Sequence, residues 1–259
     1  MDGAMHVSGM QIAMMVVSFV FIIAMMVVLL GRYRRDEDLS RTLIWGLVIF
    51  MGTNAIVNGF GVVLNKTSWF LSLPQLAQLM LFTVVVALSF VIISFFVMKA
   101  FVKKHLNEDT PIMMVLGFML MNVFQTAMSL MNYIMLSLAI NKGDTAKFIG
   151  DNTNPEMVQN AIDSVLAIQP IGYLDVSVSV LADFIAYATV LIILYRLFTS
   201  RKDRGVSYAI IAVGILVSYR LVIEFAKYQI ASPLLLIAIK LVVSSLVGYT
   251  GYIFYKEDF

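Results

Sequence analysis

The chain contains no cysteine among its 259 residues, which excludes disulfides, thiolate metal sites and a cysteine nucleophile. Histidine is almost as scarce: there are two, His6 and His105, and neither lies inside a long apolar run. We therefore expect no histidine-ligated metal within the apolar part of the chain. No motif in the sequence calls for a cofactor, so we expect none.

Charge is also scarce, at 13% of residues, whereas 61% of residues are hydrophobic. A soluble domain is about a quarter charged and about half apolar. The apolar excess lies in runs too long for a globular core, which indicates a protein that crosses the lipid bilayer several times. The net charge of +2 is small, and nothing in the sequence suggests nucleic-acid binding.

Seven apolar runs are long enough to cross a hydrocarbon layer of about 30 Å. Each must be a helix, because an open strand leaves its backbone polar groups unsatisfied in lipid. No internal repeat or linker divides the chain, so we predict an all-α, single-domain bundle over residues 1–259. The predicted spans are 10–31, 43–64, 75–98, 111–139, 172–197, 206–226 and 232–254.

The loops carry their positive charge unevenly. With the N-terminus outside, the inner segments hold twelve of the 18 Lys and Arg residues and the outer segments hold four. This bias predicts an N-out, C-in multi-pass protein of a cell membrane, most simply a bacterial plasma membrane. Asp2 stands where a signal peptide would be basic, so the first span is expected to be an uncleaved anchor.

Residues 140–171 form an unusually long outer segment. Within it, Asn154 is a candidate N-cap, and Pro155 and Glu156 suit the first helical turn. Apolar residues then recur on one face, which predicts a short amphipathic helix. It could lie on the outer membrane surface or cover the ends of the spans.

Polar side chains inside the spans are the strongest candidates for function, because an unbonded polar group in hydrocarbon costs several kcal/mol. Span four has a stripe with one polar side chain per turn, and spans five to seven carry charges. The candidate polar cavity consists of Asn122, Gln125, Ser129, Asn132, Asp183, Arg220, Glu224 and Lys240. Further polar residues in the spans are Asn54, Asn58, Gln75, Gln78, Asp175 and Ser244.

These residues allow two interpretations. They could line a functional cavity between spans four and seven, or the amides and serines could hold helices together through interhelical hydrogen bonds. Asp183 and Lys240 could pair across helices, and Arg220 could pair with Glu224 one turn away. Asp175 lies near the outer end of its span and is expected to be hydrated.

Several segments, taken in order, resemble the YhfC family, which is grouped with CAAX-processing, bacteriocin-processing and PrsW-type intramembrane proteases. They cover nearly the whole chain. They are "VSGMQIAMMVVSF" at 7–19, "GFMLMNVFQTAMSLMNYIMLSLAINKG" at 117–143, the amphipathic segment ending near Pro170, "LADF" at 181–184 and "RLVIEF" at 220–225.

The resemblance implies a catalytic centre that this chain does not reproduce. The family has a Glu-Glu pair followed by Arg in span three, where this chain reads "LSFVIISFFVMKAF". It has a His with a Glu in span four, about where Asn122 or Gln125 stands here. The family's later acids correspond to Asp183 and Glu224, and Arg220 stands at a His position. Amides do not exchange protons near neutral pH, so the family's reaction is not expected.

The expected function is therefore a non-catalytic scaffold or binding partner for another membrane protein or a hydrophobic peptide. The anterior-pharynx-defective subunit of gamma-secretase offers a clan-level analogy. Two alternatives stay open. The first is an intramembrane protease using Asp183 and Glu224. The second is a carrier of small solutes or ions using Asp183 and Lys240, for which Gly59 and Gly61 could break span two.

Overall fold

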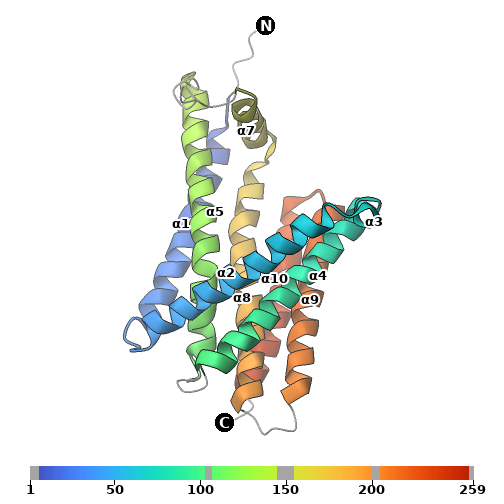
Figure 1. Ribbon diagram of the computed structural model, residues 1–259. Coiled ribbons are helices and arrows are strands. Elements are labelled where there is room, and N and C mark those ends of the chain that lie inside the picture. The colour runs from blue at the N-terminus through green and yellow to red at the C-terminus, as the bar shows by residue number, and fades with distance from the viewer. Residues whose placement is uncertain (1–5, 103–106, 145–154, 200–204, 257–259) are drawn as a thin grey trace.

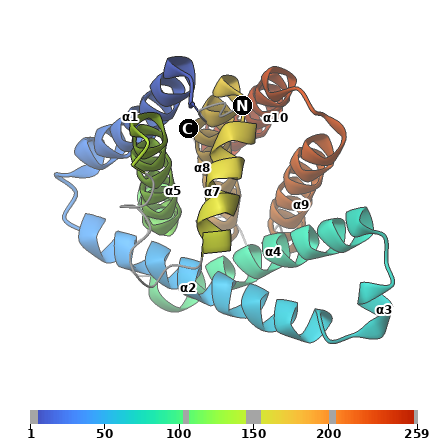
Figure 2. The ribbon, with the colours of Figure 1, turned by 90° about the horizontal axis from the view of Figure 1, so that it is seen from above.

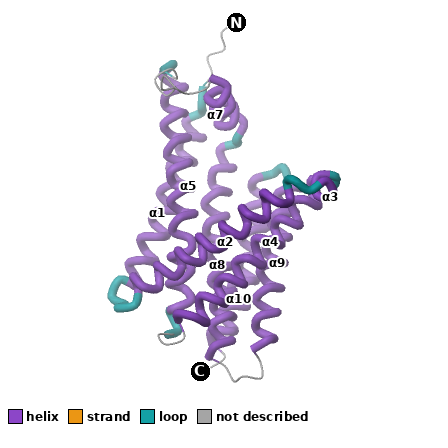
Figure 3. Tube along the Cα trace, in the orientation of Figure 1, coloured by secondary structure: helices purple, strands orange, loops and turns teal. Residues whose placement is uncertain are grey.

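A computed structural model describes residues 6–102, 107–144, 155–199 and 205–256. Within these residues every regular element is helical (Figure 3). The elements are α1 (Gly9–Tyr33), α2 (Leu39–Leu64), α3 (Ser68–Leu71), α4 (Gln75–Val97), the π-helical turn η1 (Met98–Val102), α5 (Thr110–Lys142), α7 (Pro155–Ala167), α8 (Pro170–Thr199), α9 (Gly205–Gln229) and α10 (Pro233–Lys256).

Seven of these helices are long and apolar enough to span a membrane, which confirms the predicted all-α polytopic bundle. Each coincides with one predicted span, although α5 is 33 residues long and extends further than expected at its C-terminal end. Gly143 ends α5 in the left-handed conformation, with φ of 70°, where a residue without Cβ meets no steric cost.

Helix α8 is the central element, and it packs against α1, α5, α9 and α10. Viewed from above, these helices form an arc, and α2 and α4 lie across its open side (Figure 2). Both α2 and α4 are strongly tilted relative to α5 and α8 (Figure 1). As a result, α2 crosses α5 near the first turns of α5 and leaves a later part of α5 without this neighbour.

The crossing of α2 and α5 depends on two glycines that face each other. A Cβ added to Gly46 would overlap the backbone of Met114, and one added to Gly117 would overlap the backbone of Leu43. Small residues allow membrane helices to approach this closely, so that dispersion contacts form along the crossing. This contact fixes the point at which the tilted helix α2 crosses α5.

An aromatic cluster fills the interior beside this crossing. The ring centroids of Phe90 and Phe118 lie 4.8 Å apart, and that of Tyr187 lies 4.4 Å from Phe90 and 4.8 Å from Phe118. All three residues are buried, and they join α4, α5 and α8. Offset and edge-to-face contacts of this kind add to the energy of area burial.

Helix α7 packs against the ends of the spans, as in one of the two placements that the sequence left open. Ile162 and Val165 are buried, and the backbone oxygen of Val165 accepts from the Tyr173 hydroxyl at 3.3 Å. The Gln11 amide donates to the backbone oxygen of Ile168 at 2.9 Å, which ties α1 to the turn between α7 and α8. The candidate N-cap Asn154 lies outside the described residues.

Candidate functional site

Four polar residues repeat at every fourth position of α8. They are Asp175, Ser179, Asp183 and Tyr187. An i, i+4 spacing places them on one face of the helix, and this face meets α9 and α10. The sequence interpretation recognised the two aspartates but missed Ser179 and Tyr187. The same four-residue period would have identified them.

Lys240 of α10 is bound at the first half of this polar face. Its side chain is 2% exposed, and its Nζ donates to both Asp175 carboxylate oxygens at 2.5 and 2.6 Å. A third bond goes to the Ser179 hydroxyl at 2.7 Å. The Lys240 ammonium therefore has three partners, which matches its three N–H donors.

This arrangement corrects the candidate pairing of Asp183 with Lys240. Both α8 and α10 run from their proline starts, Pro170 and Pro233, toward the same side of the bundle (Figure 1). Lys240 meets Asp175 near the start of α8, and later along the same helix pair Thr189 donates to the backbone oxygen of Val247. Asp183 lies about 12 Å further along α8. Asp175, which was expected to be hydrated, forms this ion pair and keeps 21% of its side chain exposed.

Asp183 is bound instead by residues of α9. The Tyr219 hydroxyl donates to its carboxylate at 2.9 Å, and the guanidinium of Arg220 lies 3.8 Å away. Arg220 also donates to the Tyr187 hydroxyl, and its guanidinium carbon lies 5.2 Å from the Tyr187 ring centroid. The cluster of Asp183, Tyr187, Tyr219 and Arg220 is thus a second polar contact between neighbouring helices.

The expected pairing of Arg220 with Glu224 is not formed. Glu224 accepts from Lys227 at 2.7 Å in an i, i+3 pair near the end of α9. Arg220 turns toward α8 because Asp183 and Tyr187 offer it partners in the interior. The two carboxylates once considered as an acid and base therefore have separate cations. They do not form a shared carboxylate pair.

The amide stripe of α5 does not join these charged clusters. Asn122 is half-buried, and Gln125, Ser129 and Asn132 are exposed. Ser129 donates to the backbone oxygen of Gln125 at 3.0 Å, and Asn122 makes a long contact of 3.9 Å to the Met119 sulfur. Across the described residues, the side-chain amides of Gln125 and Asn132 form no hydrogen bond. The predicted single cavity is therefore divided into the two charged clusters and this uncovered stripe.

A pocket of about 300 Å³ lies between α5 and α8 beside the stripe. Gln125 and Ser129 line it from α5, together with Thr126 and Tyr133. Gly172 and Val176 form part of the opposite wall. The stripe therefore borders a groove.

A second feature of α5 lies next to the stripe. Large apolar residues next to the stripe are exposed by 37% to 59% and repeat at alternating spacings of three and four residues. This is the a/d period of a helix seam that packs against another helix. The seam consists of Met121, Phe124, Met128, Met131, Met135 and Leu138.

Two of the remaining amides of the spans are satisfied within their own segments. Asn54 donates to the backbone oxygen of Phe50 at 3.0 Å, and Gln78 donates to that of Leu73 at 2.9 Å. Asn54 and Gln78 therefore have local structural roles. Asn58 and Gln75 are exposed and, like Gln125 and Asn132, form no hydrogen bond with the described residues. Comparisons of the chain with protein-family models, curated proteins and solved structures find no significant match.

Proposed function

We propose that this protein is a non-catalytic membrane scaffold that binds a transmembrane helix of another membrane protein, or a hydrophobic peptide, along α5. The observation that carries the proposal is the exposed amide stripe in the middle of a membrane-spanning helix. The amides of Gln125 and Asn132 have no hydrogen-bond partner in the described part of the chain, although Gln125 lies 15 residues from the start of the 33-residue α5.

An amide without a partner in hydrocarbon costs several kcal/mol, and no water is present there to replace the missing bond. A partner helix with its own Ser, Thr, Asn or Gln would satisfy these groups. Such bonds contribute about 0.6 kcal/mol each on average, so the amides specify register more than they supply affinity. Most of the affinity would come from packing along the seam.

The methionine-rich seam suits this role. Four of its six members are methionine, a flexible side chain that adapts its shape to a partner surface. Its alternating spacing matches the left-handed crossing of about +20° that is common between membrane helices. The tilted helices α2 and α4 slant away from this part of α5 (Figure 1).

The two alternatives are less well supported by the geometry. Proteolysis needs carboxyl groups free to exchange protons, whereas Asp183 and Glu224 are bound to Arg220 and Lys227. A carrier needs charged side chains that are free to bind and release the transported ion or solute. Lys240 is instead held by three short contacts within the bundle. Both charged clusters are therefore expected to stabilise helix packing.

Site-specific photo-crosslinking tests the proposal. A photoreactive phenylalanine analogue at Phe124 is expected to give one discrete protein adduct in membranes. The same analogue at Val27, which is 62% exposed on α1, is expected to crosslink lipid alone. Because the amides set the register, the crosslink should move to another residue of the partner in Gln125→Leu and Asn132→Leu. It should stay in place in Val62→Leu, a matched change at an exposed position of α2.

Three outcomes would contradict the proposal. They are an adduct of two copies of this chain, an adduct that is unchanged in both leucine variants, and crosslinking to lipid alone at Phe124. Cleavage of a single-span substrate that stops with Asp183→Asn in a folded protein would instead support the protease.

A further inference from the structure

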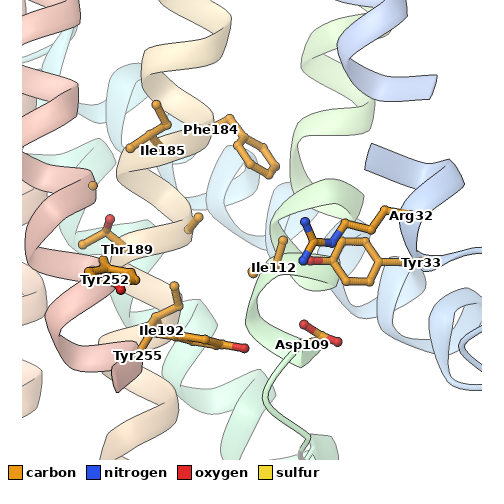
Figure 4. A pocket seen from close by; sticks show the side chains of 13 residues that line it. Arg32, Tyr33, Asp109, Ile112, Phe184, Ile185, Thr189, Ile192, Tyr252 and Tyr255 are labelled. Atoms are coloured by element: carbon orange, nitrogen blue, oxygen red, sulfur yellow. The ribbon is translucent and has the colours of Figure 1, made fainter. Parts of the chain in front are cut away.

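A second pocket, of about 310 Å³, lies at the opposite end of α5 from Lys142. It is bordered by the last turns of α1 and α10, the start of α5, and the middle and second half of α8 (Figure 4). Its volume is at the lower end of the range for ligand sites, roughly 300–1,000 Å³. None of its residues belongs to the stripe, the seam or the charged clusters.

One end of this pocket is polar. The Arg32 guanidinium, the Tyr33 hydroxyl, the Asp109 carboxylate and the Tyr255 hydroxyl point into the same region (Figure 4). Arg32 lies 5.8 Å from the Tyr33 ring centroid. Within the described residues, neither Arg32 nor Asp109 forms an ion pair, and Asp109 makes no capping bond to α5. One charge of each sign, neither of them in an ion pair among the described residues, therefore faces this end.

The other end is apolar and extends deeper into the bundle. Phe184, Ile185, Ala188 and Ile192 of α8 form one wall, and Gly248 of α10 lies beside them. From Tyr255 back to Gly248 the pocket follows seven residues of α10, a rise of about 10 Å. The polar end coincides with the ends of the spans, at the depth where Arg and Tyr meet lipid headgroups.

We propose that this pocket binds one phospholipid whose headgroup carries a phosphate and a primary ammonium, as phosphatidylethanolamine does. The phosphate accepts hydrogen bonds from the fork of the Arg32 guanidinium and from the Tyr33 hydroxyl. The ammonium donates to Asp109 and Tyr255, and one acyl chain occupies the apolar end. The Asp109 carboxylate repels a purely anionic headgroup such as that of phosphatidylglycerol. The quaternary ammonium of phosphatidylcholine has no N–H group to donate to Asp109.

Native mass spectrometry of the delipidated full chain in detergent tests the proposal. Phosphatidylethanolamine, phosphatidylcholine and phosphatidylglycerol with identical acyl chains are supplied in equal amounts. The wild type is expected to retain one phosphatidylethanolamine several-fold over the other two. Arg32→Gln should reduce this retention about tenfold, the effect of losing charge-assisted hydrogen bonds. Asp109→Asn should abolish the preference over phosphatidylcholine.

The controls separate the pocket from the surrounding surface. Arg34→Gln removes an exposed arginine outside the pocket and should leave the retention pattern unchanged. Ala188→Phe narrows the apolar end and should reduce retention of all three lipids. Its gel-filtration profile should match that of the wild type, which shows that the variant is folded. Glycerophosphoethanolamine, which has no acyl chains, should not displace the lipid.

The proposal is overturned by wild-type retention in Arg32→Gln or in folded Ala188→Phe. It is also overturned by equal retention of phosphatidylglycerol and phosphatidylethanolamine. Displacement by glycerophosphoethanolamine would show a site for a soluble phosphate compound instead. None of these outcomes bears on the crosslinking experiment at Phe124, so the two proposals can fail separately.

Discussion

At the residue scale, the charges inside the bundle form two separate contacts between α8 and its neighbours. Lys240 is held by Asp175 and Ser179, and Arg220 by Asp183 and Tyr187. A charge in hydrocarbon is tolerated when it is paired and its hydrogen-bonding groups are satisfied. These contacts therefore connect α10 and α9 to the central helix.

Replacing Lys240 tests the first contact. Lys240→Met leaves Asp175 without its cation in a low-dielectric region, and we expect the free energy of unfolding in detergent to fall by about 3 kcal/mol. Adding Asp175→Leu should recover most of that loss, because an apolar pair replaces the ions. Lys227→Met breaks a more exposed pair and should cost at most about 1 kcal/mol. Equal losses for Lys240→Met and Lys227→Met would contradict this interpretation.

Asp183 tests the second contact and its assignment as structural. Asp183→Asn removes the carboxylate from Arg220 and should lower the free energy of unfolding by about 1–2 kcal/mol, since both groups are partly exposed. Tyr219→Phe should cost about 1 kcal/mol, and the double variant should show non-additive coupling. Chemical denaturation in detergent measures all three. An Asp183→Asn protein as stable as the wild type would argue against a structural role.

The sequence identified the charged residues but not all of their partners. A charged residue stands out within an apolar span, and residues four apart share one face of a helix. These two signals identified Asp175, Asp183, Arg220 and Lys240 in the sequence. Which charge meets which depends on the depth of each residue along its own helix. Lys240 binds Asp175 and Ser179, in the first turns of α8, whereas Asp183 lies two turns further along that helix. Span ends estimated only to within a few residues leave that depth uncertain.

At the element scale, the spans were predictable but their tilt was not. A hydrocarbon layer requires about 20 apolar residues, so length and hydropathy locate each span. Tilt depends on packing against neighbours, and here it follows from the close contact between Gly46 and Gly117. Two glycines in separate apolar helices carry no signal that they will meet. The uncovered seam of α5, which results from this tilt, could not be inferred without it.

The α2–α5 crossing leads to a prediction with a matched control. Gly46→Ala places a methyl group against the Met114 backbone and should lower the free energy of unfolding by about 1–3 kcal/mol. Gly59→Ala, in the same helix, has no atom within 4 Å of the new Cβ and should be neutral or stabilising by up to about 1 kcal/mol. Thermal unfolding of both variants in one detergent compares them. A similar loss of stability in both variants would exclude a specific contact at the crossing of α2 and α5.

At the scale of the whole molecule, the orientation in the membrane is a prediction from loop charge alone. A chain without cysteine is well suited to testing it, since every introduced thiol is the sole target of a maleimide. Lys66→Cys lies between α2 and α3, and Glu108→Cys lies just before α5; both positions are exposed. With the N-terminus outside, an impermeant maleimide should label Lys66→Cys on intact cells. It should label Glu108→Cys after permeabilisation alone. The opposite labelling pattern would show that the N-terminus lies inside. The Arg32 pocket would then face the outer leaflet, where the lipid headgroups differ.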